Sequence, residues 1–333
     1  MQRRWSKSLG VLLALLLCSH PAIAAYMPSQ AQRLVVYTAH KEDVYTPIIR
    51  EFENRTGIWV TVVAGSTAEM LERISFEADA PVCDVMFGGG VESLEAYQAY
   101  FSYPPADLSQ LIDSRYVVPD SRWLPFSALP VVLIYNPRLV GSRPPLGWIN
   151  LLDGRFSGRI AFADPVVSGS SYTALLTLLT VLPEADTLPR FVRALRGRVL
   201  SGSGDVVEAV ANGTCTVGIT LEETAMKAIA SSMDIAMTYP EEGTTVVPDG
   251  AAIITGCPHP ANAELFMRFI LSKDVQTYLI TEMYRRPVRA DIPLIAPFVQ
   301  NFSRIGYDIR LMGTQKAEQL RDWADALREG AAP

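Results

Sequence analysis

The first hundred residues alternate β-rich segments with amphipathic helical segments, and this order constrains the fold more than any other feature. Residues 33–37 and 59–63 are rich in β-branched and aromatic side chains. Between them, residues 42–54 carry apolar side chains at helical spacing. Ser66 and Glu69 have the spacing of a capping box at the start of another helix. Repetition of strand, turn and helix predicts an α/β protein with mostly parallel sheets.

A second alternating series follows the Gly- and Pro-rich stretch at 144–158. Its predicted elements are strands at 159–163, near Val199 and at 216–220, and helices at 170–182, 189–195 and 205–211. Long apolar strands at 128–135 and 250–255 join the two series, and further helices are predicted at 260–271, 274–284 and 314–327. Two α/β series joined by long strands indicate two lobes with a hinge, and the largest cleft is expected between them.

The N-terminus has the pattern of an export signal. A basic start precedes an apolar run at 9–17, which is too short to span a membrane. Small residues such as Ala22 occupy the positions that signal peptidase prefers. We therefore expect a cleaved signal peptide of residues 1–24 and a mature protein in the periplasm. The alternative is a lipoprotein anchored at Cys18, although Leu17 stands where a small residue is preferred.

Charge, cysteine content and catalytic motifs exclude several function classes. The formal net charge of −6 argues against nucleic acid as a partner. Beyond the signal peptide the chain has only His40 and His259, and it contains no GxSxG, P-loop or HExxH motif, so we expect neither an enzyme nor a cofactor. Its three remaining cysteines, Cys83, Cys215 and Cys257, lack the spacing of metal ligands, so we expect no metal site built on them.

The ends of the first three strands are candidate ligand-binding positions. Ligands in open α/β sheets lie beyond the carboxyl ends of the strands, where the helices begin. Most residues at these ends are small, which allows the backbone to approach a ligand closely. The candidates there are Thr38, His40, Ser66, Thr67, Gly89 and Gly90.

A serine-rich segment begins the predicted helix at 170–182. Free N–H groups and the positive end of the helix dipole make such a helix start suited to phosphate. An ordinary capping role for Ser168 or Ser170 is the alternative. The candidates in this second series are Ser168, Gly169, Ser170, Ser171 and Tyr172, together with Ser203, Asp205 and Glu222, of which the last two are suited to sugar hydroxyls or an ammonium group.

Several segments together resemble one known family, the class II periplasmic binding proteins of ABC importers. They are Leu34-Val35-Val36-Tyr37-Thr38-Ala39-His40, Cys83-Asp84-Val85-Met86-Phe87-Gly88-Gly89, Ile134-Tyr135-Asn136-Pro137, Ser168-Gly169-Ser170-Ser171-Tyr172, Pro258-His259-Pro260 and Arg285-Arg286-Pro287-Val288-Arg289. Each motif is weak alone, but their order and spacing cover nearly the whole mature chain. The chain is most similar to the branch that holds ferric-ion, phosphonate, phosphoglycerate and hexose-phosphate binders.

The resemblance implies a two-lobed Venus-flytrap fold of α/β lobes with hinge strands between them. Residues 25–136 and 241–333 would form lobe 1, and residues 137–240 would form lobe 2. The protein would act as a monomer that carries a small anionic ligand to an ABC permease in the inner membrane. A membrane sensor kinase is the alternative partner, since both partners recognise the closed lobes.

In the same fold, the strand that begins at Cys83 and the return strand before Cys257 are neighbours. The resemblance therefore makes Cys83 and Cys257 the candidate disulfide. Cys215 would lie in the other lobe, where a bridge would obstruct the hinge.

The expected ligand class depends on one motif of the family that this chain lacks. Ferric binders of this branch use a pair of adjacent tyrosines in lobe 2, and the matching stretch here, 220–224, reads Thr-Leu-Glu-Glu-Thr. We therefore expect a small phosphorylated organic anion, namely a hexose phosphate, a phosphoglycerate or a phosphonate. A ferric ion is the alternative. The basic residues at 285–289 are typical of surface charge, although one could reach the cleft.

Overall fold

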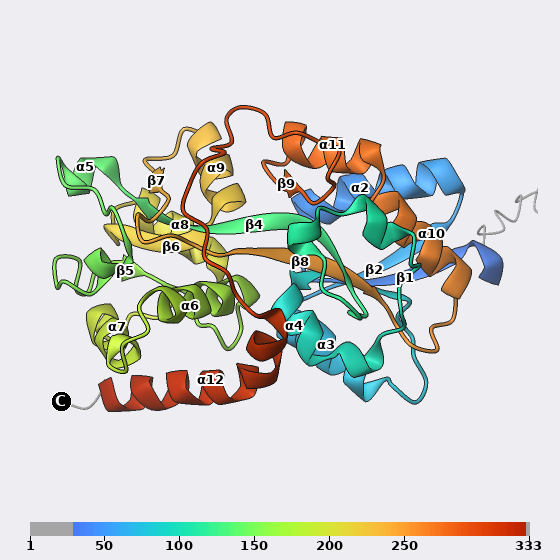
Figure 1. The fold of residues 1–333 in the computed structure, drawn as a ribbon, viewed down its shortest axis with the longest axis horizontal. Coiled ribbons are helices and arrows are strands. Elements are labelled where there is room, and N and C mark those ends of the chain that lie inside the picture. Colours follow the sequence, from blue (N-terminus) through green and yellow to red (C-terminus); the bar gives the residue numbers. More distant parts are fainter. Residues whose placement is uncertain (1–28, 331–333) are drawn as a thin grey trace, which may run out of the picture.

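The computed structural model describes residues 29–330, so the predicted signal peptide lies outside the described residues. The strands are β1 (Arg33–Thr38), β2 (Trp59–Ala64), β3 (Val85–Gly90), β4 (Leu124–Tyr135), β5 (Ile160–Ala161), β6 (Val217–Leu221), β7 (Ala236–Thr238), β8 (Val246–Ile253) and β9 (Arg286–Pro287). The α-helices are α2 (Glu42–Thr56), α3 (Thr67–Phe76), α4 (Val91–Ala96), α5 (Pro137–Val140), α6 (Gly169–Val181), α7 (Thr187–Leu195), α8 (Ser203–Ala211), α9 (Glu222–Ala230), α10 (Pro260–Ile270), α11 (Lys273–Glu282) and α12 (Ile309–Gly330). They form two lobes that lie side by side (Figure 1).

The first lobe is built on a sheet of strand order β2-β1-β3-β8-β4, with α2, α10 and α11 over one face and α3 and α4 over the other (Figure 1). β1 pairs in parallel with β2 and β3, whereas β8 runs antiparallel to both β3 and β4. The local sequence explains the helices. Ser66 and Glu69 form the predicted capping box at the start of α3, and α2 ends at Gly57, whose φ of 69° suits glycine.

The second lobe is built on β4, β6 and β5, and alternate side chains of β4 fill cores on the two faces of this sheet. Val131 and Leu133 pack in a core with α6 and α7, whereas Val132 and Ile134 pack in a core with α8 and α9. This division follows from the two-residue period of a strand. The predicted strand near Val199 is reduced to a single bridge between Ala163 and Leu200.

β4 belongs to both sheets and is the main connection between the lobes. Its first part, up to Pro130, pairs with β8, and its second part, from Val131, pairs with β6. The chain returns to the first lobe through Thr244 and Thr245, which are both buried. Two adjacent strands therefore cross between the lobes, as expected for a hinge.

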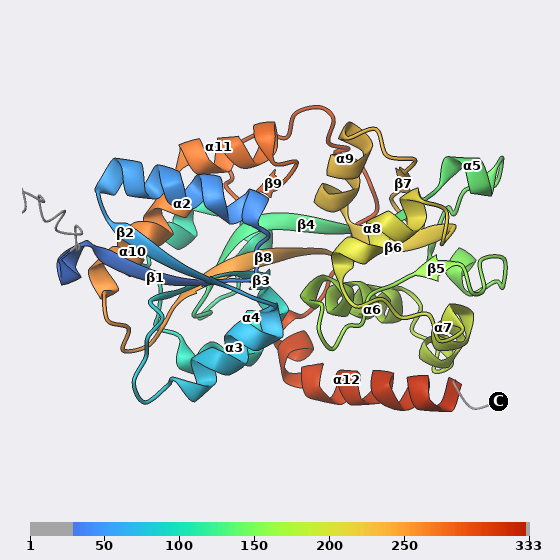
Figure 2. The ribbon, with the colours of Figure 1, turned by 180° about the vertical axis from the view of Figure 1, so that it is seen from behind.

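Helix α12 lies along the second lobe after starting beside α4 of the first lobe (Figures 1 and 2). Met312 belongs to the first core, and Gly313 approaches the α4 backbone so closely that a Cβ would lie 3.1 Å from Glu92 O. Trp323, fully buried, belongs to the second core beside Phe162. The expected boundary, which put all of residues 241–333 in lobe 1, therefore differs from the packing of α12.

The three cysteines of the described part are free thiols, which contradicts the expected Cys83–Cys257 disulfide. The Cys83 thiol points back to its own strand and donates to Val85 O at 3.2 Å. Asp84, between the two segments, accepts hydrogen bonds from the backbone and ring of His259, which fix the turn after Cys257. Burial raises the pKa of the Cys257 thiol to about 11, so this thiol stays protonated near neutral pH. The adjacency of the two segments was therefore not sufficient to bring the thiols of Cys83 and Cys257 together, because the two side chains have different surroundings.

Within residues 29–330, the structure contains no helix with the length and apolar character that crossing a bilayer requires.

Replacing Trp323 by alanine tests whether α12 is an integral part of the second lobe. Because the ring is fully buried and its Nε1 donates to Asp164 at 3.2 Å, we expect a loss of about 3–5 kcal/mol in the free energy of unfolding. Urea denaturation measures this loss. Trp59, which is 57% exposed, provides the control, and Trp59→Ala should change stability by about 0.5 kcal/mol or less. Equal effects of the two substitutions would contradict the assignment.

Candidate functional site

A cavity of about 340 Å³ lies between the lobes, and the starts of six helices converge on it. The residues that immediately precede these helices all line the cavity: Lys41 for α2, Ser66 for α3, Gly90 for α4, Ser168 for α6, Gly202 for α8 and Leu221 for α9. The first N–H groups of a helix have no partner within the helix, and the helix dipole puts positive charge there. The cavity therefore presents backbone donors and positive potential from both lobes.

The start of α6 lies directly against the first lobe. Ser168 caps α6 by accepting a hydrogen bond from Ser171 N at 3.3 Å, and its hydroxyl lies 3.2 Å from that of Ser170. A Cβ at Gly169 would lie 3.0 Å from Thr67 Oγ1, and a Cβ at Gly89, whose φ is 89°, would lie 2.8 Å from Thr67 Cγ2. Gly169 is thus needed for α6, and Gly89 for the end of β3, to approach Thr67 of α3 this closely.

Arg285 is a buried cation at the cavity wall. Its Nη1 donates to Asp249 Oδ2 at 2.5 Å and to Ser127 Oγ at 3.0 Å, and Asp249 Oδ1 also accepts from Ser127 N at 2.8 Å. The Nε of Arg285 is buried and has no hydrogen-bond partner in the described structure. The Nε–H group of Arg285 is therefore available to a ligand, although Asp249 balances the charge of the guanidinium.

Glu223 adds a paired carboxylate from the second lobe. Lys227 Nζ lies 2.6 Å from Glu223 Oε1 and 2.7 Å from Asp43 in α2, so this lysine connects the lobes. Burial favours the neutral acid, but the cations Arg285 and Lys227 outweigh it and hold the pKa of Glu223 below its ordinary value. Glu223 is therefore ionised at neutral pH, and its charge is already matched by protein cations.

His40 lies beneath the cavity in an apolar setting. Its ring is in edge contact with Phe87 at 4.5 Å, and its Nδ1 lies 3.6 Å from Asp249 Oδ2. Its Nε2 is buried with no hydrogen-bond partner among the described residues. Burial, and then the neighbouring Arg285, hold the pKa of His40 well below its ordinary value, so the ring is neutral.

The structure brings nine of the predicted site residues to this cavity. They are His40, Ser66, Thr67, Gly89, Gly90, Ser168, Gly169, Ser170 and Ser203. They come from both lobes, and all of them lie at or next to the carboxyl end of a strand or the start of a helix.

Three predicted residues lie away from the cavity lining because they are bound within the protein. Thr38 Oγ1 donates to Phe87 O at 2.7 Å and so ties β1 to β3. Ser171 is buried on the inner side of α6. Tyr172 is buried as well, and its hydroxyl donates to Met312 O at 2.8 Å in α12. The hydroxyls of Thr38 and Tyr172 thus make contacts that join structural elements, and the expected contact of these three residues with a ligand stays a prediction.

Asp205 and Glu222 also lie outside the lining. Asp205 accepts hydrogen bonds from Ser201 Oγ at 2.6 Å and Gly202 N at 3.1 Å, and so caps α8. Glu222 forms a bidentate pair with Arg286, both bonds being 2.6 Å, with each side chain almost completely buried. The next residue, Glu223, faces the cavity instead, because successive residues of a helix point about 100° apart.

Sequence reasoning missed part of the lining. The missed polar residues are Lys41, Thr173, Glu223, Thr224 and Asp249. One signal was available: Asp249 is a carboxylate within an otherwise apolar buried strand, and such residues are rarely buried without a partner. The basic residues at 285–289 were expected at the surface, with one able to reach the cleft. Arg285 does line the cavity, and both Arg285 and Arg286 are buried beside carboxylates from elsewhere in the chain.

A second contact joins the lobes behind the cavity. Thr173 of α6 donates to Glu92 Oε1 of α4 at 2.9 Å, and Lys316 of α12 donates to Ser93 Oγ at 2.6 Å. Glu92 is fully buried, and its other oxygen has no hydrogen-bond partner in the described structure. Burial raises the pKa of Glu92 above its ordinary value, although Lys316 opposes the shift.

Two lobes around a polar cavity define a protein built to enclose a small molecule, and comparison with known proteins agrees. Residues 82–311 match the family described as bacterial extracellular solute-binding protein, and the chain belongs to this family. Its relatives include Iron uptake protein A1 of Synechocystis sp., 25% identical over 299 residues that cover 83% of this chain and 81% of that protein. Another is the Fe(3+)-binding periplasmic protein of Serratia marcescens, 24% identical over 286 residues that cover 82% and 84%.

A solved structure shows the same fold. The periplasmic binding protein AfuA of Actinobacillus pleuropneumoniae, with exogenous fructose-6-phosphate bound, superposes with a TM-score of 0.81 at 20% identity. The match covers 89% of this chain and 98% of AfuA. The predicted two-lobed periplasmic binding protein fold is therefore confirmed, and the predicted family relationship is confirmed with it.

Replacing Glu92 by glutamine tests the buried contact through its pH dependence. A carboxyl whose pKa is raised in the folded state contributes stability below its unfolded pKa of about 4.3, and this contribution is lost as pH rises through the folded pKa. Glutamine keeps the acceptor and cannot ionise. As pH rises from 4 to 8, the difference in free energy of unfolding between Glu92→Gln and the wild type should therefore shift in favour of Glu92→Gln.

Urea denaturation at several pH values measures this difference. The exposed Glu72 of α3 provides the control, and Glu72→Gln should show a much smaller dependence on pH. A difference between Glu92→Gln and wild type that does not change with pH would contradict the interpretation.

Proposed function

We propose that the protein is the periplasmic solute-binding component of an ABC importer and that it encloses a small phosphorylated organic anion between its lobes. The ligand class comprises hexose phosphates, phosphoglycerates and phosphonates. The observation that carries this proposal is the convergence of helix N-termini from both lobes on one cavity of about 340 Å³, beside the buried Arg285. A phosphate group has enough acceptor oxygens to use donors from both lobes at once.

The start of α6 is the proposed phosphate position. Ser168 and Ser170 supply hydroxyls, and Gly169 lets the backbone come within contact distance of Thr67 on the opposite lobe. A ligand held by donors of both lobes binds the closed arrangement more tightly than an open one. By that difference in affinity it would shift the protein toward closure.

The carboxylates at the cavity are compatible with an anionic ligand that also carries hydroxyl groups. Asp249 and Glu223 are paired with Arg285 and Lys227, so they neutralise protein cations and leave the helix starts to attract the ligand. Hydroxyls of a sugar or glycerate would find acceptors in the same two side chains. The ligand's non-phosphate part would therefore lie toward Glu223.

The surrounding biology follows from the family. Solute-binding proteins of this family are extracellular, which supports export through a signal peptide of residues 1–24 and delivery to an inner-membrane permease as a monomer. The relatives are named as uptake or binding proteins, which supports a role without catalysis. A sensor kinase remains the alternative partner, and co-purification with a permease or with a kinase distinguishes the two.

Ferric ion is the second candidate ligand, because two of the relatives are named for iron uptake and Fe(3+) binding. Hard cations favour anionic oxygen ligands, and the cavity offers Glu223 and Asp249. Both carboxylates are already engaged by protein cations, which favours the phosphorylated ligand.

A thermal-shift screen tests the ligand class. Hexose phosphates, phosphoglycerates, phosphonates, inorganic phosphate, and ferric ion with a synergistic anion are added separately. One organophosphate at a hundredfold excess over its Kd should stabilise the folded protein by about 2.7 kcal/mol. A visible charge-transfer band with iron, and no shift with any organophosphate, would establish the ferric alternative instead.

Replacing Ser170 by tryptophan tests the proposed phosphate position. The side chain lies at the cavity and is only half-buried, so the indole should block the start of α6 without disturbing a core. We expect at least a hundredfold weaker binding in calorimetry and a nearly unchanged melting temperature. Ser75→Trp, at a half-buried position of α3 outside the cavity lining, is the matched control and should bind normally. Retained affinity in Ser170→Trp would refute this position.

A further inference from the structure

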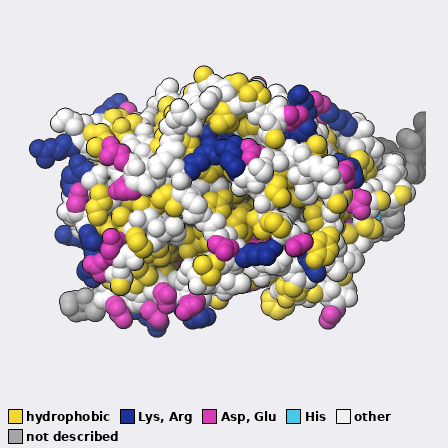
Figure 3. Space-filling model, viewed as in Figure 1, with side chains coloured by type: hydrophobic (Ala, Val, Ile, Leu, Met, Phe, Trp, Pro, Cys, Tyr) yellow, Lys and Arg dark blue, Asp and Glu magenta, His cyan; other side chains and the backbone are white. Residues whose placement is uncertain are grey.

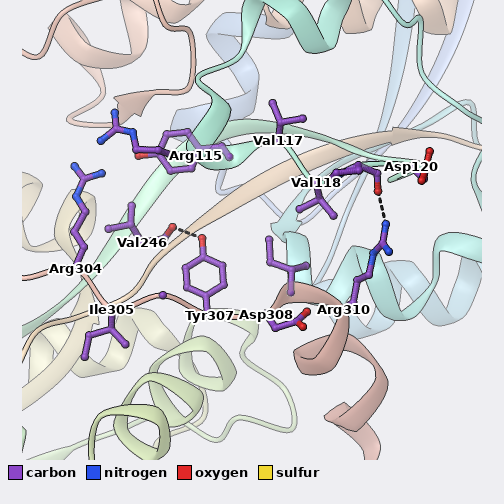
Figure 4. Close-up of a pocket in the computed structure, with 14 residues that line it drawn as sticks. Arg115, Val117, Val118, Asp120, Val246, Arg304, Ile305, Tyr307, Asp308 and Arg310 are labelled. Carbon is purple, nitrogen blue, oxygen red and sulfur yellow. Dashed lines mark hydrogen bonds between the residues drawn. The ribbon is translucent and has the colours of Figure 1, made fainter.

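A second cavity, of about 650 Å³, lies where the segment leading into α12 passes over the hinge strand β8 (Figures 1 and 4). Three parts of the chain line it: residues 115–120 of the first lobe, Val246 at the start of β8, and residues 304–310. We call it the hinge-face cavity. Its volume is in the range of cavities that hold small molecules. Figure 3 shows a hollow near the centre of this face, with basic side chains above it, basic and acidic ones below it, and hydrophobic side chains in its floor.

The hinge-face cavity has a basic end. Arg115 and Arg304 lie together at one end of it (Figure 4). Arg115 is paired with Asp113, with Nη2 and Oδ2 at 2.5 Å. The guanidinium of Arg304 stacks on Phe302 at 5.2 Å and has no hydrogen bond or ion pair with any described residue. Asp113 pairs with Arg115, and no carboxylate of the described residues pairs with Arg304, so this end keeps a positive charge and the unused planar donors of Arg304.

The middle of the cavity is apolar, and its other end carries charges of both signs, from Asp120, Asp308 and Arg310. Val118, Val246 and Ile305 contribute aliphatic walls between the two ends (Figure 4). At the far end, Arg310 donates to Pro119 O, and Asp308 accepts from Leu311 N at 3.1 Å at the start of α12. Asp120 also lies at the far end and has no hydrogen bond or ion pair with a described residue, so that end carries charges of both signs, whereas the end that holds Arg115 and Arg304 is basic.

The hinge strand β8 connects this cavity to the interlobe cavity. Val246 lines the hinge-face cavity, whereas the next residue, Val247, lines the interlobe cavity, because successive side chains of a strand point to opposite faces. Tyr307 donates to Val246 O at 2.5 Å, and the backbone of Arg304 forms an isolated parallel β-bridge with Thr244. The segment that lines the hinge-face cavity is thus hydrogen-bonded to the strand that both cavities share.

We propose that the hinge-face cavity is a second binding site, for an anion with an apolar aromatic or aliphatic body, and that its occupancy restrains β8. The anionic group lies against Arg304 and Arg115, and the apolar body covers Val118, Val246 and Ile305. A bare inorganic anion gains only the first of these contacts. Because Val246 and Val247 are consecutive, a ligand that immobilises one face of β8 reduces the freedom of the other face.

The probe that tests the site is 8-anilinonaphthalene-1-sulfonate, an aromatic anion that fluoresces in apolar surroundings. It is titrated into the purified protein without a solute, so the result does not depend on the proposed cleft ligand. The double variant Arg115→Ala/Arg304→Ala should bind it at least tenfold more weakly. Arg193→Ala/Arg321→Ala, which removes two exposed arginines from α7 and α12, is the matched control and should bind as the wild type does.

Two further measurements show whether the probe occupies the hinge-face cavity and no other part of the protein. Ser170→Trp blocks the interlobe cavity and should leave probe binding unchanged. A misfolded variant would expose more apolar surface and raise the fluorescence, so misfolding cannot produce the expected loss. Wild-type affinity in Arg115→Ala/Arg304→Ala, or loss of binding in Ser170→Trp, would overturn the site.

Hydrogen exchange tests the connection through β8. Saturating probe should slow exchange of the backbone amides of Val246, Val247 and Asp249 by at least threefold in the wild type and leave it unchanged in Arg115→Ala/Arg304→Ala. Probe binding that depends on Arg304 while exchange in β8 stays the same would overturn the connection.

Discussion

The continuous pairing of β4 with β8 is the constraint on which the rest of the structure depends. β4 contributes to both sheets, so neither lobe can complete its core without the strand that joins it to the other. The same pairing puts Leu129, Val247 and Asp249 at the interlobe cavity. Because both crossing strands are buried along most of their length, relative motion of the lobes is confined to rotation about this pair.

Two sets of buried ion pairs lie beside these strands. Arg285 is paired with Asp249 and lies 3.7 Å from Glu223, whereas Arg286 is paired with Glu222. In both sets the arginine belongs to the return segment of the first lobe and a glutamate belongs to α9 of the second. Removing one partner would leave an uncompensated buried charge, which destabilises a protein strongly. These pairs therefore set the orientation of α9, and with it the side of the helix that faces the cavity.

Helix α12 gives the two lobes a third connection away from the strands. Its first turns pack on α4 through Gly313, and Trp323 fills a place in the core of the second lobe. The Glu92–Thr173 contact lies beside it. A closing motion must therefore bend or slide α12 as well as rotate the strands. The hinge-face cavity lies at the start of the same helix, where the chain leaves β8 for α12.

The sequence by itself determined the order of strands and helices, the capping box at Ser66 and the family, because these depend on neighbours along the chain. It also located nine residues of the cavity, since the ends of strands and the starts of helices meet there in any such sheet. The tertiary structure alone decided that Glu223 and not Glu222 faces the cavity, that Arg285 is buried beside Asp249, and that Cys83 and Cys257 stay apart. Each of these depends on the rotation of a side chain against a segment far away in the sequence, and local pattern carries no information about that rotation.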